Sequence, residues 1–169
     1  MNKAIFLDRD GTINVDYGYV HEIDKLEFIP GVIEGLKILQ DMGYLLIIVT
    51  NQSGIGRGMY DLKAYRKFNR YMLKELEKHD IHITDVFMCP HTDEDNCECR
   101  KPKLKMYYDA IKKYDIDVEN SYTIGDRPRD ISLCKKEKVK GILISQEENK
   151  EYLCKDSLYQ AALYIKENN

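Results

Sequence analysis

Five short apolar runs punctuate the chain, and most of them are followed directly by polar residues. Runs of four to six apolar residues, several bounded by glycine or polar residues, are typical of strands buried on both faces of a parallel sheet. The sequence therefore predicts five mostly parallel strands, at Ala4–Leu7, Tyr44–Val49, Ile83–Met88, Ser121–Ile124 and Gly141–Ile144.

The segments between these runs repeat apolar residues every three or four positions, as amphipathic helices do. The predicted helices contain Val32, Leu36 and Leu39; Leu62, Tyr65, Phe68, Met72 and Leu76 behind a possible Asp61 N-cap; Met106, Ala110 and Ile111 after Pro102; about Asp130–Lys138; and Ser157–Glu167. Strands that alternate with helices predict an α/β fold with a doubly wound, mostly parallel sheet.

Polar residues gather where three of the strands end. "DRDGT" follows the first run, "TNQSGIGRG" the second and "GDRPRD" the fourth. Ligands of open parallel sheets bind beyond the carboxyl ends of the strands, so Asp8, Asp10 and Asp126 are expected to meet there and to suit a hard cation such as Mg²⁺. The glycine-rich run offers backbone N–H groups, and Thr50 a hydroxyl, to anionic oxygens. A D-x-D-G sequence in isolation is equally compatible with a surface turn, but three such strand ends favour a site.

Paired aspartates beside magnesium can divide the work of phosphoryl transfer. One carboxylate attacks phosphorus, while the other protonates the departing oxygen and later takes a proton from water. A lysine and the cation would neutralise charge on the transferred group.

The most conspicuous motif is C-x-H-x5-C-x-C, formed by Cys89, His91, Cys97 and Cys99. Three sulfurs and one imidazole match a tetrahedral Zn²⁺ site, and four protein ligands leave no open position, which favours a structural role. The alternative is a cluster of free thiols. The loop over 89–99 has little apolar surface, so zinc would order it and direct the residues that follow, Arg100 and Lys101, toward phosphate.

The composition is that of a soluble globular protein, with 43% hydrophobic and 33% charged residues. A net charge of −3 gives no field that would gather nucleic acid. A chain of 169 residues is expected to form one domain over 1–169 and to be a monomer. Five unevenly placed cysteines without an export signal or membrane-spanning stretch predict reduced thiols and a cytoplasmic location. Cys134 and Cys154, in segments expected to be helical, are interpreted as packing residues.

Four motifs, in order, resemble those of haloacid dehalogenase superfamily phosphatases: "FLDRDGTIN", Thr50 in "VTNQSG", "CRKPK" and "IGDRPRD". The resemblance runs from Lys3 to about Ser145. Within the superfamily the chain is similar to the small capless group that contains heptose bisphosphate phosphatases and histidinol-phosphate phosphatases. The resemblance thus implies a capless Rossmann-like fold carrying a small zinc loop.

The resemblance also implies roles for individual residues. Asp8 would be the nucleophile and Asp10 the general acid/base. Magnesium would bind the Asp8 carboxylate, the Asp10 backbone carbonyl, Asp126 and, in some relatives, the Arg127 backbone. Phosphoryl oxygens and substrate would be held by Thr50, Asn51, Ser53, Gly54, Arg100 and Lys101, with Lys103 as a second candidate for the lysine. The leaving portion would contact Asp16, Tyr17, Gly18, Tyr19 and His21. From the residues alone, 16–21 is an aromatic loop, and Asp130 either supports magnesium or the lysine or caps a helix.

The motifs divide between two substrates. "INVDYGYVHEIDKLEFIPGV" and "NQSGIGRG" resemble the heptose group, whereas the compact zinc loop, "CRKPK" and "SYTIGDRPRDI" resemble the histidinol group, and "KPKLKM" departs from the P-x-P-G-M pattern of the heptose group. The loop after the first motif would touch the leaving group, so heptose bisphosphate is preferred and histidinol phosphate is the alternative. Two further alternatives are an inactive phosphate- or partner-binding protein and a nucleic-acid end-processing phosphatase. The acidic balance and the lack of a separate kinase or basic arm argue against the latter.

Overall fold

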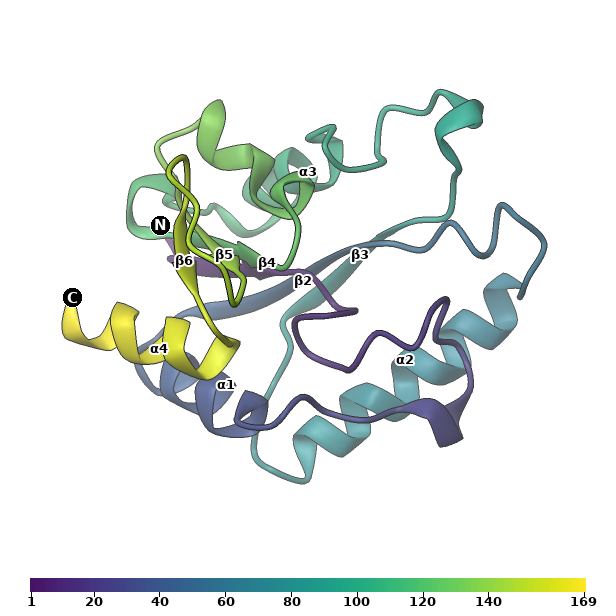
Figure 1. The fold of residues 1–169 in the computed structure, drawn as a ribbon, viewed down its shortest axis with the longest axis horizontal. Helices are drawn as coiled ribbons and strands as arrows, with labels where there is room; N and C mark the ends of the chain where they lie inside the picture. Colours follow the sequence, from purple (N-terminus) through teal and green to yellow (C-terminus); the bar gives the residue numbers. More distant parts are fainter.

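The computed structural model describes residues 1–169 and contains a six-stranded sheet with helices on both faces (Figure 1). All strand pairs are parallel, and the strand order is β3-β2-β1-β4-β5-β6. The strands are β1 (Ala4–Leu7), β2 (Leu45–Asn51), β3 (Asp85–Cys89), β4 (Tyr122–Gly125), β5 (Lys140–Ile144) and β6 (Leu153–Lys155). The sheet is therefore the expected doubly wound one.

Four α-helices and four short 3-10 segments connect the strands. The α-helices are α1 (Val32–Asp41), α2 (Leu62–Glu77), α3 (Lys105–Tyr114) and α4 (Leu158–Glu167). The 3-10 segments are Ile23–Lys25, Asp93–Asp95, Val118–Asn120 and Pro128–Lys135. In Figure 1, α1, α2 and α4 lie on one side of the sheet and α3 on the other. No helix has both the length and the apolar character that crossing a bilayer requires.

Both faces of the sheet are covered by helices. Neighbouring side chains on a strand point to opposite faces, so each strand contributes to both packed layers. In β1, Ile5 and Leu7 pack with α1, α2 and α4, whereas Ala4 and Phe6 pack with α3. This double burial explains why β1 is an unbroken apolar run rather than an alternating one.

The five predicted strands are confirmed, with β1 matching at both ends and the other ends displaced by at most two residues. The prediction missed β6, a three-residue strand at the sheet edge, and was wrong to expect Cys154 in a helix, because it lies in β6. The helix predicted over about Asp130–Lys138 is instead the 3-10 segment Pro128–Lys135, with non-helical dihedrals at Ile131. Asp61 does cap α2, accepting a hydrogen bond from the Ala64 N–H at 2.8 Å.

The polar strand ends meet because β1 lies between β2 and β4. Leu7, the last residue of β1, pairs with Ile48 of β2 and Ile124 of β4. Asp8 follows at once, so "DRDGT", "TNQSG" and "GDRPRD" leave the same edge of the sheet at one level. This edge is where an open parallel sheet binds ligands.

Candidate active site and metal sites

Lys101 lies at the base of the site and joins two carboxylates. Its ammonium donates to Asp8 Oδ1 at 3.0 Å, to Asp130 Oδ1 at 2.8 Å and to the Val49 carbonyl at 2.7 Å. All three ammonium protons thus have acceptors, as the 1% exposed fraction of Lys101 requires.

The electrostatics of this base depend on burial. Burial and the Asp130 carboxylate raise the pKa of Asp8 well above its usual range, while Lys101 lowers it. Burial would lower the pKa of Lys101, but the Asp8 and Asp130 carboxylates outweigh that effect and hold it above its ordinary value. Lys101 is therefore a fixed cation beside Asp8.

Asp126 supplies a carboxylate oxygen that could bind a cation. Carboxylate oxygens of Asp8, Asp126 and Asp130 lie within 4.8 Å of one another. Asp126 Oδ1 is buried without a hydrogen-bond partner, and burial together with Asp130 raises the pKa of Asp126 to about 6. Gly11, at φ +85°, leaves the room for this carboxylate, since a Cβ there would lie 2.2 Å from Asp126 Oδ2. An unpaired buried oxygen beside a second carboxylate fits a hard divalent cation.

Asp130 holds the lysine, as one of the expectations from the sequence had it. One of its oxygens accepts from Lys101, and the other accepts from the Arg127 backbone N–H at 3.0 Å. The expectation of an N-cap was wrong, because Arg127 is the N-cap of the 3-10 segment and Asp130 lies inside it, where its side chain closes the first turn. The Arg127 carbonyl in turn accepts from the Asp130 N–H at 2.9 Å, so both backbone groups of Arg127 are engaged in this turn.

A cavity of about 300 Å³ opens above Asp8 and Asp10. Most of the residues expected at the site line it: Asp8, Asp10, Asp16, Gly18, Tyr19, Asn51, Ser53, Arg100 and Arg127. Tyr19 takes φ 49°, in the left-handed region that bulky residues rarely adopt. Such backbone strain clusters at ligand sites.

Other expected residues lie near the cavity without lining it. Thr50 is fully buried, and its hydroxyl accepts from Gln52 Nε2 at 2.9 Å. Gly54 packs behind the wall, where a Cβ would lie 2.1 Å from the Tyr60 ring. His21 stacks on Tyr60, with ring centroids 4.4 Å apart.

Two further residues point elsewhere. Tyr17 is 58% exposed and donates to Glu27 Oε1 at 2.6 Å. Lys103 donates to the Cys97 carbonyl in the loop over 89–99, whereas the ammonium that donates to Asp8 is that of Lys101. Lys101 is therefore the lysine that reaches the carboxylates.

Sequence reasoning missed several polar residues of the site. Gln52, Arg57, Tyr60 and Arg129 line the cavity, and the buried Arg9 binds Asp10. Arg9, Gln52, Arg57 and Arg129 stand inside the motifs at the strand ends, so position alone could have drawn attention to them. Tyr60 lies outside every motif and gave no such signal, because tyrosines are frequent outside sites.

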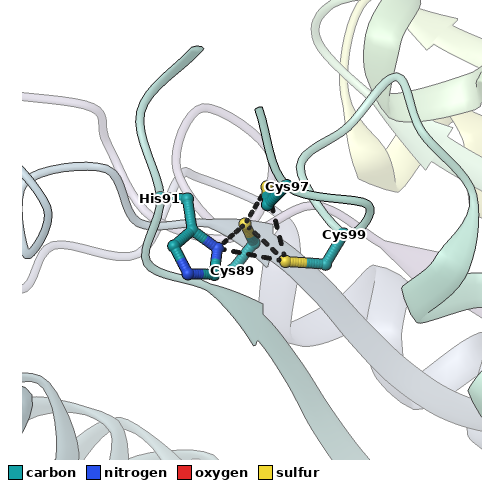
Figure 2. Close-up of side chains that lie close together, drawn as sticks. All are labelled: Cys89, His91, Cys97 and Cys99. Atoms are coloured by element: carbon teal, nitrogen blue, oxygen red, sulfur yellow. Dashed lines mark hydrogen bonds between the residues drawn. The ribbon is translucent and has the colours of Figure 1, made fainter. Parts of the chain in front are cut away.

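Cys89, His91, Cys97 and Cys99 converge as the zinc motif predicts (Figure 2). The Cys89 and Cys99 sulfurs each lie 3.4 Å from His91 Nδ1 and 3.6 and 3.7 Å from the Cys97 sulfur, while the Cys89–Cys99 separation is 2.8 Å. A tetrahedral zinc with Zn–S bonds of about 2.3 Å places its ligand atoms about 3.7 Å apart. The donor set and most of its spacings fit zinc.

The loop over 89–99, which we call the thiol loop, is connected to the cavity through two residues, Arg100 and Asn51. Arg100 donates to Asp93 Oδ1 at 2.8 Å and to the His91 carbonyl at 3.2 Å. The Asn51 side chain pairs with the Lys101 backbone, accepting from its N–H at 3.0 Å and donating to its carbonyl at 3.2 Å. The end of β2 thus fixes the backbone just beyond the loop.

Known proteins are similar to this chain in sequence and in fold. The family described as Polynucleotide kinase 3 phosphatase matches residues 3–166. The D-glycero-beta-D-manno-heptose-1,7-bisphosphate 7-phosphatase of Haemophilus influenzae is 47% identical over 137 residues, covering 78% of this chain and 74% of that protein. The D-glycero-alpha-D-manno-heptose-1,7-bisphosphate 7-phosphatase of Campylobacter jejuni is 44% identical over 149 residues, covering 88% and 86%.

A solved structure agrees with these relatives. The D,D-heptose 1.7-bisphosphate phosphatase from B. bronchiseptica, complexed with magnesium and phosphate, superposes with a TM-score of 0.88 at 27% identity and covers 99% of both chains. The family match spans nearly the whole chain, and the fold with its aspartate-lined strand ends is the one expected from the motifs. The chain belongs to the polynucleotide kinase 3 phosphatase family of haloacid dehalogenase superfamily phosphatases.

Proposed function

We propose that the protein is a magnesium-dependent phosphomonoester hydrolase that removes the 7-phosphate of D-glycero-D-manno-heptose 1,7-bisphosphate through an aspartyl-phosphate. The relatives named above act, by their names, on this compound in its β or α form.

Asp8 is the proposed nucleophile because its carboxylate accepts from Lys101 and also forms part of the candidate cation site. Its carboxylate oxygen forms a bond to phosphorus as the bond from phosphorus to the sugar oxygen breaks, and Asp10 gives the departing oxygen a proton. Water then attacks the aspartyl-phosphate and passes its proton to Asp10, which frees phosphate and restores both carboxyl groups.

Positive charge at the base supports this transfer. Lys101 is held within hydrogen-bond distance of Asp8 and would face the phosphoryl oxygens, together with the backbone beyond β2. Asp8 and Asp126 would hold Mg²⁺, which when bound supplies Lewis-acid polarisation of the phosphoryl group. The cluster of Cys89, His91, Cys97 and Cys99 would hold a structural Zn²⁺, and the aspartates would carry out the phosphoryl transfer.

The observation that carries the choice of substrate is the charge of the cavity wall. Four arginines, Arg57, Arg100, Arg127 and Arg129, line it above the carboxylates. One phosphate at the base is already served by Lys101 and the cation, so the arginines favour a second anionic group on the leaving portion. Histidinol phosphate would instead bring a cationic amine against them. Its lower rank therefore rests on electrostatics as well as on the loop at 16–21.

A direct comparison of substrates tests this proposal. Specificity constants kcat/KM would be measured with Mg²⁺ on both heptose 1,7-bisphosphate anomers, on histidinol phosphate and on a 3′-phosphorylated oligonucleotide. We expect a bisphosphate anomer to be preferred, and preference for either other substrate would overturn the assignment. Asp8→Asn should abolish turnover of every substrate, because an amide does not attack phosphorus.

Arg129 offers a sharper test of the charge argument. Arg129→Gln should raise KM for the bisphosphate about tenfold, equivalent to about 1.4 kcal/mol, and change KM for heptose 7-phosphate less than twofold. Arg70→Gln, on the exposed face of α2, is the matched control. Equal effects on both compounds would mean that Arg129 does not meet the second phosphate. The single domain over 1–169, the monomeric state and the cytoplasmic location remain predictions from the sequence.

A further inference from the structure

The Asp10 carboxylate is held by side chains that no motif role explains. Its Oδ1 accepts from Arg9 Nη2 at 3.0 Å and from Asn14 Nδ2 at 3.0 Å, and its Oδ2 accepts from Gln52 Nε2 at 3.0 Å. Both oxygens are therefore fixed before substrate binds. A group that must give and take protons at defined positions gains rate from such fixation.

The first of these holders also grips the loop at 16–21. Arg9 Nη2 donates to the Val20 carbonyl at 2.7 Å as well as to Asp10. The guanidinium is 1% exposed and lies 4.7 Å from the Phe68 ring centroid, so packing leaves it little freedom. One buried cation thus spans the loop backbone and the carboxylate.

The second holder reaches the same loop by another path. Gln52 Oε1 accepts from the Tyr60 hydroxyl at 2.6 Å, and the Tyr60 ring stacks on His21 with an interplanar angle of 10°. The ionised form of Asp10 only accepts, and in that form Gln52 turns its amino group to Asp10 and its carbonyl to Tyr60. Burial raises the pKa of Tyr60 to about 12, which keeps its proton available for that carbonyl. The orientation of the amide is thereby set from the side of His21.

We propose that Arg9 and Tyr60 are positioning residues that couple the loop at 16–21 to the carboxylate of Asp10. A leaving group bound against the loop then lies beside a proton donor that the same side chains hold in place. This inference rests on the phosphatase mechanism proposed above, and it adds to that mechanism a link between recognition and proton transfer.

Tyr60→Phe tests the link, because it removes only the hydroxyl and keeps the ring that stacks on His21. The rate of the first half-reaction would be measured in single turnovers with heptose 1,7-bisphosphate and with 4-nitrophenyl phosphate. The sugar alkoxide needs a proton to leave, whereas nitrophenolate does not. We expect a loss of about tenfold on the bisphosphate, a modest share of what general acid catalysis contributes, and less than a twofold loss on the nitrophenyl ester.

Three controls give the result its meaning. Tyr65→Phe alters another buried tyrosine, on α2, that makes no hydrogen bond to Gln52, and should leave both rates unchanged. Asp10→Asn should show the same dependence on leaving group as Tyr60→Phe, only larger. If it does not, the proposed mechanism fails, whatever Tyr60 does. Thermal unfolding of Tyr60→Phe would confirm that the variant is folded.

Equal losses on both esters, or no loss on either, would overturn the positioning role. If heptose bisphosphate is not a substrate, 2-glycerophosphate replaces it as an alkyl ester and the same comparison holds. The coupling itself is tested by combining Tyr60→Phe with His21→Ala. Both break one path, so their combined loss should be smaller than the product of the separate losses, and a full product would refute the coupling.

Discussion

Replacing Lys101 with methionine removes one charge from the most buried ionic cluster of the protein and keeps the side-chain volume. The lysine is 1% exposed and faces two carboxylates, of which Asp8 is 12% and Asp130 2% exposed at the side chain. Removing one partner of a buried ion pair costs about 3–5 kcal/mol, because the other charge stays buried without compensation. The open cavity beside Asp8 admits water, so we expect a loss near the lower end, about 3 kcal/mol at pH 8.

The loss should depend on pH with a definite sign. Lys101 lowers the pKa of Asp8, which burial and Asp130 already raise, so the variant raises that pKa further. A carboxyl with a raised pKa holds a proton that the unfolded chain has released, and lowering the pH below the raised value therefore stabilises the folded state. The difference in unfolding free energy between wild type and Lys101→Met should be largest at pH 8 and shrink toward pH 5.

Urea unfolding at pH 5, 6, 7 and 8 in buffer without added Mg²⁺ measures this difference. Lys103→Met is the control, because that lysine lies in the same stretch but is exposed and bonds only the Cys97 carbonyl. It should cost less than about 0.5 kcal/mol at every pH. An equal loss for the two variants, or a loss for Lys101→Met that does not change with pH, would refute the view that Lys101 balances the buried carboxylates.

Three further changes have equally defined outcomes. Gly11→Ala should weaken Mg²⁺ binding about tenfold or more in calorimetric titration, because its Cβ would lie 2.2 Å from an Asp126 carboxylate oxygen. Gly58→Ala is the control, since Gly58 also has a positive φ but has nothing within 4 Å, and it should cost only about 1 kcal/mol of stability. Unchanged Mg²⁺ affinity in Gly11→Ala would contradict the cation site. Cys97→Ser should lose zinc in elemental analysis and unfold at lower temperature, whereas Cys134→Ser should retain it; a wild-type protein without zinc would rule out the structural site. Asp61→Ala should destabilise α2 by about 1 kcal/mol in urea unfolding, and no measurable loss would show that this cap is dispensable.

The sequence predicted the features that depend on local patterns, namely the apolar strands and the cysteine–histidine motif. Runs such as Ala4–Leu7 are apolar because both sheet faces are covered, and that signal needs no knowledge of distant contacts. Cys89 to Cys99 form a site within one short loop, so ligand type and spacing sufficed. The sequence did not predict strand β6, because its three residues are exposed or only partly buried and the strand depends on pairing with β5.

The supporting residues of the site could not be predicted in the same way. Tyr60 acts through Gln52 and His21, which lie eight and thirty-nine positions away, and only the folded chain brings them together. Asp130 was foreseen as either an N-cap or a partner of magnesium or the lysine; one of its oxygens binds the lysine, and the other closes the turn that begins at Arg127. Local patterns identify residue types, whereas shared use of one side chain appears only in three dimensions.

The pairing of the Asn51 amide with the Lys101 backbone has a consequence for how such enzymes diverge. It anchors the chain immediately after the thiol loop, so the Lys101 backbone is held by β2 as well as by that loop. Arg100, one residue earlier, takes its contacts from that loop. We therefore expect insertions or deletions between Cys89 and Arg100 to displace Arg100 more than Lys101, and to alter substrate preference more than the proposed hydrolytic step.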